Sequence, residues 1–166
     1  MTETPLNKAP FRKTHPRAYP GSEFFLLWGT GNGGAVVGGS APREPQILPF
    51  FAGPGGTRLL LARYAPEGST SPLAGDADEL AGEVDEKLPG LRDVFDPDDT
   101  SGMHATDTLD YGICLEGELV LELDEGEVLL TPGSCVVQQG TRHTWHNRGT
   151  APALMCFVGI GATRES

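Results

Sequence analysis

Three of the four histidines in the chain occur in two short stretches that also carry polar residues. His104 lies in HATDTLDYG (residues 104–112), and His143 and His146 lie in RHTWHN (residues 142–147). Imidazole and carboxylate groups bind divalent transition metals, and imidazole exchanges protons near neutral pH. The two stretches can build one metal site if two strands bring them together. The alternative is that both are solvated β-turns.

Strand geometry limits which side chains of the first stretch can meet. In one straight strand, His104 and Asp110 would lie roughly 20 Å apart at about 3.3 Å per residue, too far to share an ion. The chain must therefore reverse between them. We expect the reversal at Asp107 and Thr108, because Asp and Thr side chains bond to nearby backbone in turns.

The second stretch has the side-chain alternation of a β-strand. His143, Trp145 and Asn147 share one face of it, and Thr144 and His146 share the other. Only one of the two histidines can therefore point into a barrel. We predict that His143 and Trp145 point inward, with Trp145 packed against the barrel wall. His146 is expected to be solvated or to lie at an interface.

Length and composition predict one mostly β domain. A chain of 166 residues can bury a core without disulfides or metal staples. Its 23 glycines and 14 prolines favour short strands joined by turns. Four apolar runs in residues 23–65 predict four strands, or three and an irregular segment. A hairpin is expected around Asp124 to Gly126, and ALMCFVGIGA predicts the last strand.

Residues 75–90 break this pattern and predict the one helix. Leu80, Val84 and Leu88 recur at four-residue spacing, and an aspartate precedes the first turn as a cap. We expect the helix to pack across the outside or the mouth of the barrel. The acidic segment 75–99 is interpreted as helix plus exposed loop, either a solvated face or a lid.

The ends of the chain define the predicted domain. Residues 1–22 are rich in proline and basic residues and lack an apolar period, so they predict an arm or a disordered tail. Residues 23–162 are then the single domain.

Charge and cysteine usage restrict partners and compartment. The net charge is −11, and residues 65–166 alone carry twenty acidic and five basic groups, so a nucleic-acid backbone would be repelled. No apolar run approaches the roughly 20 residues of a membrane-spanning helix. Three cysteines without C-x-x-C spacing or a secretory leader are expected to be small buried hydrophobes in a reducing cytoplasm.

The two histidine stretches resemble the motifs of the cupins, specifically the small single-domain cupins. The first cupin motif runs G-x5-H-x-H-x3-E-x6-G. His104, Thr106, Asp110 and Gly117 stand at its His, His, Glu and final Gly positions. The resemblance covers residues 100–162.

The second cupin motif runs G-x5-P-x-G-x2-H-x3-N. Gly133, His143 and Asn147 match it across a loop that is one residue shorter. The resemblance implies an all-β fold, the cupin double-stranded β-helix or jelly roll, with an N-terminal strand region and one short helix. Such a barrel encloses a small-molecule pocket.

The resemblance also implies a metal site. Cupins with the full motif hold a divalent metal with three histidines and a glutamate, and here Thr106 replaces one histidine and Asp110 the glutamate. The implied ligands are His104, Asp110 and His143. This set leaves open coordination positions and suits Fe, Mn, Ni or Zn. Thr106 could hold a metal-bound water, and Asp110 could instead be a turn residue.

Two functions remain open. The first is a metal-dependent enzyme acting on a small organic molecule with a carbonyl or carboxylate, of the lyase or decarboxylase, isomerase or dioxygenase type. Its further pocket candidates are Thr106, Tyr111, Cys114 and Trp145, and the acid-base candidates near the motif are Tyr111, Cys114 and Asp107. The second is a non-catalytic cupin that only binds a small molecule, with a degenerate or absent metal site.

The resemblance finally implies a homodimer. We expect the N-terminal arm, with strands at 24–28 and 47–51, to add to the sheet of a partner.

Overall fold

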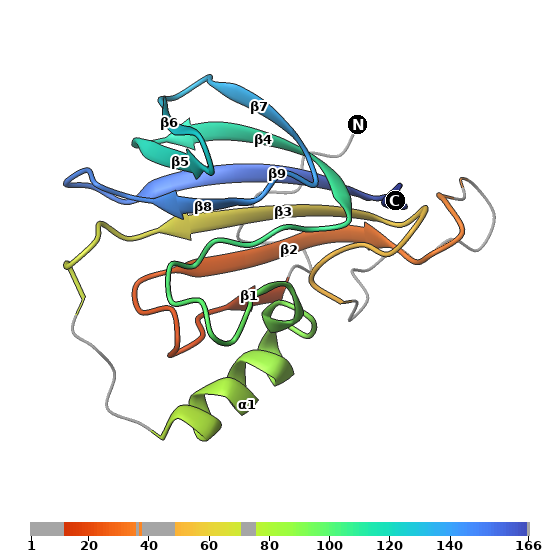
Figure 1. Ribbon diagram of the computed structural model, residues 1–166, viewed down its shortest axis with the longest axis horizontal. Helices are drawn as coiled ribbons and strands as arrows, with labels where there is room; N and C mark the ends of the chain where they lie inside the picture. Colours follow the sequence, from red (N-terminus) through yellow and green to blue (C-terminus); the bar gives the residue numbers. More distant parts are fainter. Residues whose placement is uncertain (1–11, 36, 38–48, 71–75, 166) are drawn as a thin grey trace.

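The computed structural model describes residues 12–35, 37, 49–70 and 76–165, which form two antiparallel sheets and one α-helix (Figure 1). The larger sheet has the strand order β1-β2-β3-β9-β4-β7, and the smaller has the order β6-β5-β8. The elements are β1 (Arg12–Thr14), β2 (Glu23–Thr30), β3 (Thr57–Tyr64), α1 (Ala77–Lys87), the 3-10 turn η1 (Arg92–Val94), β4 (Thr108–Glu116), β5 (Leu119–Leu123), β6 (Gly126–Leu130), β7 (Cys135–Gln139), β8 (His143–His146) and β9 (Ala153–Gly161). The predicted all-β class with one short helix is confirmed.

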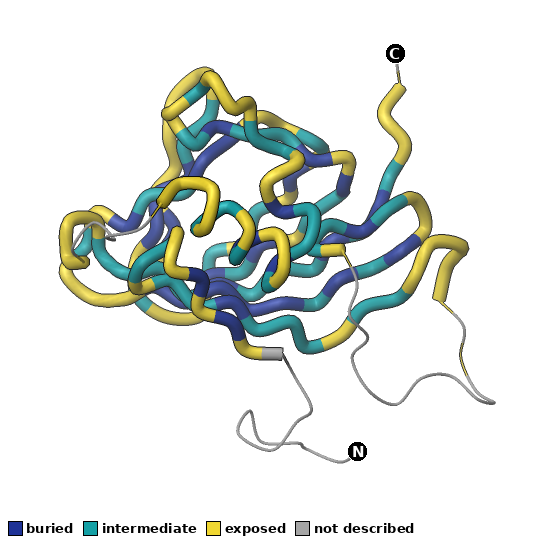
Figure 2. The backbone as a smooth tube through the Cα atoms, turned by 90° about the horizontal axis from the view of Figure 1, so that it is seen from below, coloured by how far each residue is buried: buried dark blue, intermediate teal, exposed yellow. Residues whose placement is uncertain are grey.

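The interior contains two apolar clusters, one against each end of the larger sheet. The first joins β2 and β3 to α1 and consists of Phe24, Leu60, Ala62, Val84, Leu88 and Leu91. The second joins β4 and β9 to the smaller sheet and consists of Cys114, Leu119, Leu121, Leu130, Ala153 and Met155. Tyr64 and Phe157 pack against both clusters. Figure 2 shows the buried positions concentrated along the strands, with the loops exposed.

Helix α1 begins where the sequence predicts it. The Asp76 carboxylate accepts a hydrogen bond from the Asp78 amide, which caps the first turn. Val84 and Leu88 are buried against the inner face of β2 and β3, whereas Leu80 is half-buried. The helix therefore covers the part of the larger sheet that lies away from the smaller sheet (Figure 1).

The N-terminal region differs from the predicted arm. Arg12–Thr14 pair with Phe24 to Leu26 as strand β1, which satisfies the backbone groups at the edge of β2. Strand β1 thus occupies the free edge of β2 at Phe24 to Leu26, within the strand 24–28 that was expected to add to the sheet of a partner. The homodimer itself stays a prediction. Of the four apolar runs, two form β2 and β3. Half of each of the runs at 34–39 and 46–51 lies outside the described residues, and the described halves are not in a strand.

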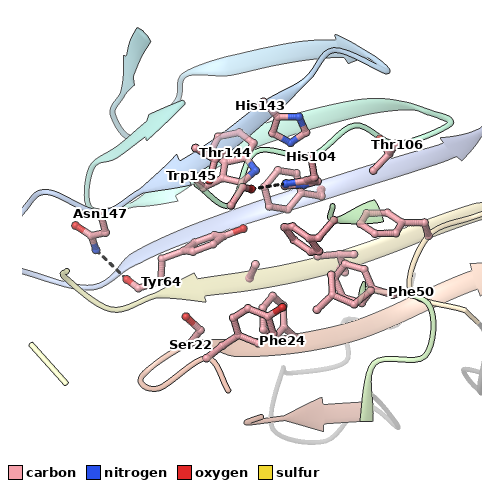
Figure 3. A pocket seen from close by; sticks show the side chains of 18 of the residues that line it. Ser22, Phe24, Phe50, Tyr64, His104, Thr106, His143, Thr144, Trp145 and Asn147 are labelled. Carbon is pink, nitrogen blue, oxygen red and sulfur yellow. Dashed lines mark hydrogen bonds between the residues drawn. The ribbon is translucent and has the colours of Figure 1, made fainter. Parts of the chain in front are cut away.

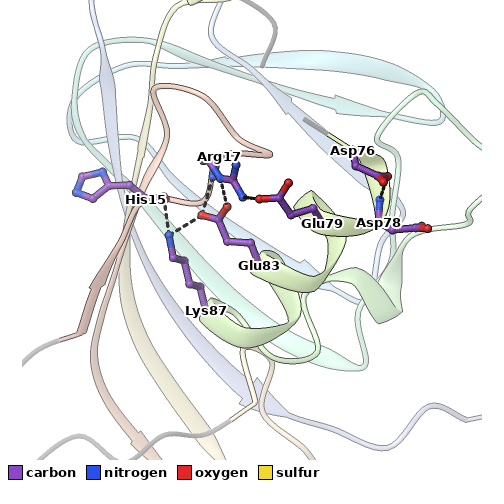
Figure 4. A network of polar contacts seen from close by, with 7 residues as sticks. All are labelled: His15, Arg17, Asp76, Asp78, Glu79, Glu83 and Lys87. Atoms are coloured by element: carbon purple, nitrogen blue, oxygen red, sulfur yellow. Dashed lines mark hydrogen bonds and ion pairs between the residues drawn. The ribbon is translucent and has the colours of Figure 1, made fainter. Parts of the chain in front are cut away.

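Ion pairs connect the segment that follows β1 to helix α1 (Figure 4). The Arg17 guanidinium binds the carboxylates of Glu79 and Glu83, and the Lys87 ammonium binds Glu83 and donates to the His15 carbonyl. The hydrogen bonds from Lys87 and Arg17 lower the pKa of Glu83 to about 2. The sequence gives no periodic signal for the Arg17 contacts, because their partners are more than 60 residues apart, whereas Glu83 and Lys87 are four residues apart on the helix.

The predicted hairpin is present, but the prediction for the cysteines is wrong at one position. Strands β5 and β6 are joined through Asp124 and Glu125, with Gly126 at φ +94°. Cys114 is fully buried and Cys156 half-buried, whereas Cys135 is exposed because its side chain lies on the outer face of β7. No helix in the described ranges is long and apolar enough to cross a membrane.

Candidate functional site

A cavity of about 420 Å³ lies between the two apolar clusters. Its lining residues come from β2, β3, β4, β7, β8 and β9, from Asn147 and from the segments 18–22, 50–52, 65–70 and 91–106. Aromatic side chains line much of it, namely Tyr19, Phe24, Phe50, Phe51, Tyr64, Phe95, Trp145 and Phe157. Polar side chains gather at the other end, namely His104, Thr106, Thr108, Asp110, Gln138 and His143.

The backbone brings the two predicted histidines together. His104 and His143 exchange two backbone hydrogen bonds, with the His104 amide 2.9 Å from the His143 carbonyl and the reverse pair at 2.8 Å. Their ring centroids are 4.4 Å apart. Phe95 and Trp145 flank the pair, with centroids 4.6 Å from His104 and 5.6 Å from His143 respectively. Both imidazoles face the cavity in Figure 3.

Both imidazoles are oriented in the same way. The His104 Nδ1 lies 3.1 Å from the Gly102 carbonyl, and the His143 Nδ1 lies 2.8 Å from the Thr141 carbonyl. A carbonyl only accepts hydrogen bonds, so each Nδ1 carries the proton and each Nε2 has a free lone pair. This orientation by the backbone is typical of imidazoles that bind a metal or accept a proton through Nε2.

Burial keeps both rings neutral. Desolvation lowers the pKa of His104 to about 4, with a smaller contribution from the neighbouring His143, against the raising effects of the Gly102 carbonyl and Asp110. Desolvation also lowers the pKa of His143. At neutral pH the site therefore presents two uncharged nitrogen acceptors to the cavity.

Asp110 lies near this pair but is bound by hydroxyl groups. Its Oδ2 accepts hydrogen bonds from Thr108 Oγ1 at 2.5 Å and from Thr106 Oγ1 at 3.4 Å. Burial raises the pKa of the Asp110 carboxyl, and the two hydroxyls and His104 act in the opposite direction. The bend at Asp107 turns the chain between His104 and β4, where the sequence predicted a reversal.

The donor set fits a divalent cation in part. Two neutral imidazoles present free Nε2 atoms from one side, which is the chemistry that Fe, Mn, Ni and Zn accept. Among the residues that the structure describes, however, no group of three His, Cys, Asp or Glu side chains lies close enough to hold a metal ion. The threonine hydroxyls engage Oδ2 of Asp110, so Oδ1 is the carboxylate oxygen that could turn toward a cation held by the two histidines.

The remaining predicted residues divide into two groups. Thr106 and Trp145 line the cavity. Tyr111 is 40% exposed on the outer face of β4, and Cys114 lies in the second apolar cluster, so neither side chain lines the cavity. Side chains alternate along β4, and the inward Asp110 therefore directs Tyr111 outward.

Asp107 and His146 also lie outside the cavity. The Asp107 carboxylate is bound to the Arg164 guanidinium at the surface. His146 Nδ1 is 2.6 Å from Glu67 and its Nε2 is 2.9 Å from Glu122, on the side of β8 opposite to His143.

Sequence reasoning missed several residues of the cavity. Tyr64 contributes a hydroxyl that points into the cavity in Figure 3, and burial raises its pKa. Gln138 lies opposite Asp110 on β7 and is 5% exposed, with no hydrogen-bond partner for its Nε2 among the described residues. The period-two phase of Arg58, Leu60, Ala62 and Tyr64 in β3 was a signal that could have identified Tyr64.

Asn147 of the second motif is structural. Its Nδ2 donates to the backbone carbonyls of Tyr64 at 2.8 Å and Ala151 at 2.9 Å (Figure 3). These bonds hold the end of β8 against the end of β3. Asn147 therefore fixes the position of the strand that carries His143.

A comparison with protein-family models identifies the part of the chain that carries the site. The model of the cupin domain family matches residues 92–159. This part of the chain is therefore a cupin domain. Its histidine pair occupies the cupin motif positions, and the jelly roll is the cupin fold. A solved structure of a sugar phosphate isomerase from a cupin superfamily of Silicibacter pomeroyi, 20% identical, superposes with a TM-score of 0.51 over 96% of this chain and 75% of that one.

Curated fungal proteins resemble part of the chain. Phomopsin biosynthesis cluster protein C' of Diaporthe leptostromiformis is 47% identical over 68 residues, which is 40% of this chain and 36% of that protein. The cupin-domain-containing oxidoreductase virC of Hypocrea virens is 44% identical over 68 residues, 39% of this chain and 35% of that protein. The matched segment thus spans about a third of the length of these relatives.

Proposed function

We propose that this cupin is an enzyme of small-molecule biosynthesis whose substrate is an apolar organic molecule with a carbonyl or carboxylate. The observation that carries the proposal is the pair of neutral imidazoles, His104 and His143, with both Nε2 atoms facing one cavity. The names of the relatives support an oxidoreductase in a biosynthesis cluster. Lyase, decarboxylase, isomerase and dioxygenase chemistry belong to the same proposal.

The aromatic end of the cavity would bind the body of the substrate. Phe24 and Phe50 pack edge to face with centroids 5.7 Å apart, and Trp145 and Phe157 do so at 5.4 Å. Rings held in this way form a rigid apolar wall that excludes water and leaves the carbonyl or carboxylate to the polar end. The cavity volume suits a ligand of metabolite size.

The polar end would orient the reacting group and move a proton. The Nε2 atoms of His104 and His143 can accept a proton or a hydrogen bond, because both rings are neutral at physiological pH. The Tyr64 hydroxyl can donate a hydrogen bond to a substrate oxygen from the opposite wall.

The proposal includes a divalent metal held by His104, His143 and Asp110. A bound Fe, Mn, Ni or Zn ion would supply Lewis acidity that polarises a carbonyl oxygen. The chain itself would contribute the two backbone-oriented imidazoles and the carboxylate, with Thr106 and Thr108 as the hydroxyls that hold Asp110 in place.

Elemental analysis of protein purified without added metal or nickel affinity resin tests this proposal. We expect about one transition-metal ion per chain in the wild type and in His146→Ala, and loss of the metal in His143→Ala. The matched pair lies on one short strand with side chains on opposite faces. Equal metal loss in both variants would contradict the assignment of the inward face.

A second function is favoured by one specific observation. Thr106 stands where the cupin motif has a histidine, and the described residues contain no group of three ligands at metal-binding distance. A metal-free wild type that binds apolar carbonyl compounds without turnover would support a non-catalytic binding cupin instead.

A further inference from the structure

The larger sheet presents one polar row of side chains to the cavity. The strand register pairs Arg58 of β3 with Gly159 of β9. It pairs Asp110 of β4 with Gly159 on one side and with Gln138 of β7 on the other. All four residues line the cavity. The next inward row of the same strands is apolar and consists of Leu60, Phe157, Gly112 and Val136.

Gln138 is buried in this row without a partner for its amide nitrogen. The residue is 5% exposed, and its Nε2 has no hydrogen-bond partner among the described residues. Buried amide groups are nearly always hydrogen-bonded, because an unpaired donor loses its bonds to water without replacement. The next residue, Gln139, points outward and is exposed. The inward glutamine therefore indicates a partner that the described part of the chain does not supply.

Gly159 leaves a recess beside Asp110. A Cβ atom at this position would lie 3.0 Å from Asp110 Oδ1 and 3.9 Å from Arg58 Cβ, and no other heavy atom of the described residues outside 158–160 would lie within 4 Å. Gly159 does not have a positive φ, so the backbone conformation does not require a glycine. The missing side chain instead leaves Oδ1 facing open space, while the threonine hydroxyls hold Oδ2.

Arg58 borders the recess but directs its charge elsewhere. Its guanidinium donates hydrogen bonds to four backbone carbonyls, those of Pro49, Thr30, Thr57 and Phe51. An anionic ligand group in the recess would therefore meet the carboxylate of Asp110 and be repelled by it. A neutral group that can donate to Oδ1 fits the recess better.

We propose that Asp110 and Gln138 together bind a hydroxyl group of the substrate. A hydroxyl accepts one hydrogen bond and donates another, so it can accept from Gln138 Nε2 and donate to Asp110 Oδ1. Opposite residues on antiparallel strands have Cβ atoms about 5 Å apart, which lets one small group reach both side chains. The inference rests on the proposed function, because it adds a hydroxyl to the carbonyl or carboxylate compound that the same cavity would bind.

The hydroxyl contact is compatible with the other roles of Asp110. An ionised carboxylate has about four lone-pair sites, and the hydroxyl would use one of them on Oδ1. His104 and Asp110 are close enough for each to shift the pKa of the other. The bound hydroxyl would therefore lie near the imidazoles. Gln138 would contact the substrate without moving a proton, because an amide does not titrate, and would act as a specificity-determining residue.

Two probes that differ only in the hydroxyl test this inference on the full chain as purified. Hydrocinnamyl alcohol and propylbenzene share a phenyl ring and a three-carbon chain, and NMR titration of isotope-labelled protein gives both affinities. We expect the wild type to bind the alcohol about tenfold more tightly than the hydrocarbon. The side-chain amide signals of Gln138 should shift with the alcohol and not with propylbenzene.

A matched pair of glutamine variants assigns the advantage of the alcohol to one side chain. Gln138→Leu removes the inward amide, and Gln139→Leu makes the same exchange on the outer face of β7. The advantage should disappear in Gln138→Leu and remain in Gln139→Leu. Gly159→Ala should also abolish it, because the added methyl group fills the recess. A cooperative thermal transition in each variant checks that the chain is folded.

Equal affinities of the wild type for the two probes, as expected if only water enters the recess, would overturn the inference. An advantage of the alcohol that persists in Gln138→Leu would do the same. Neither result touches the proposed metal site, which the metal content of His143→Ala tests separately. An advantage of the alcohol in protein that contains no metal would support the hydroxyl subsite and contradict the metal-dependent enzyme. If neither probe binds, the inference fails together with the proposed apolar substrate.

Discussion

The two ends of the cavity are built in different ways. The histidine end comes from residues 104–147, where two short motifs fix the spacing of the histidines and of Asp110. The aromatic end joins Tyr19, Phe24 and Phe50 to α1, through contacts between segments that are distant in sequence. The comparison indicates that local sequence motifs determine the reactive groups of the site. Packing between distant segments determines the shape of the cavity and therefore which ligands fit.

The two ends also differ in what burial does. At the histidine end, burial lowers the pKa of both imidazoles, which keeps them neutral at physiological pH, and raises the pKa of Asp110. At the aromatic end, burial mainly contributes apolar stabilisation. Substitutions at the aromatic end should therefore change the free energy of unfolding most, and those at the histidine end should change its pH dependence and ligand binding.

The largest effect on stability is expected for Phe24→Ala. Phe24 is 9% exposed and packs against Tyr19 and Phe50 in the cluster that holds α1. Removing its ring leaves a cavity, and we expect the free energy of unfolding to fall by about 3–5 kcal/mol in denaturant titrations. Val128→Ala, at a position 45% exposed, should cost less than about 1 kcal/mol. If Phe24→Ala and Val128→Ala lowered the free energy of unfolding by similar amounts, the aromatic end would not have the special contribution to stability that we assign to it.

The pH dependence of stability should report on the histidine end. In metal-free protein the pKa of His104 is about 4 when folded and about 6.5 when unfolded. Between these values the unfolded chain binds the additional proton, so stability is complete above about pH 6.5 and falls as the pH decreases toward 4. The His104 contribution is at most ~3 kcal/mol.

Replacement of the ring isolates this contribution. We expect His104→Gln to reduce the slope of the unfolding free energy between pH 6.5 and 4, measured by urea titration with chelator present. An unchanged slope would show that His104 is not desolvated in the folded protein. NMR titration of the imidazole would give the same answer independently.

A smaller effect is expected from the hydroxyl that holds Asp110. Thr108 is buried, and its Oγ1 is 2.5 Å from the Asp110 carboxylate. Thr108→Val should cost about 1–2 kcal/mol, because a buried carboxylate loses a donor, and should raise the pKa of Asp110 further. Thr108→Ser keeps the hydroxyl and should retain most of the stability in thermal unfolding. If valine and serine destabilise equally, the hydrogen bond contributes nothing measurable.

The difference between local motifs and long-range packing also explains which features the sequence could predict. His104 and His143 could be paired, because each motif has a fixed spacing and strand alternation selects one face for His143. Helix α1 and the hairpin at Gly126 follow from local periodicity and turn chemistry. Tyr111 and Cys114 were expected in the cavity, but the register of β4 places one at the surface and the other in the core.

Other features depend on contacts that no local pattern records. Strand β1 forms because the edge of β2 is available, and the aromatic end forms because Phe24 and Phe50 meet across the chain. Tyr64 is recognisable as a cavity residue only once the inner face of β3 is known. These are consequences of tertiary packing.

The central claim is that His104 and His143 bind one ligand together through their Nε2 atoms. Calorimetric titration of metal-free protein with Zn²⁺ at pH 7.5 tests it through the two single variants and the double variant. We predict one site in the wild type, a loss of affinity of roughly a hundredfold in His104→Ala and in His143→Ala, no change in His146→Ala, and strong non-additivity in the double variant. Additive losses, or a loss in only one of the two variants, would show that the imidazoles act separately and would contradict the account.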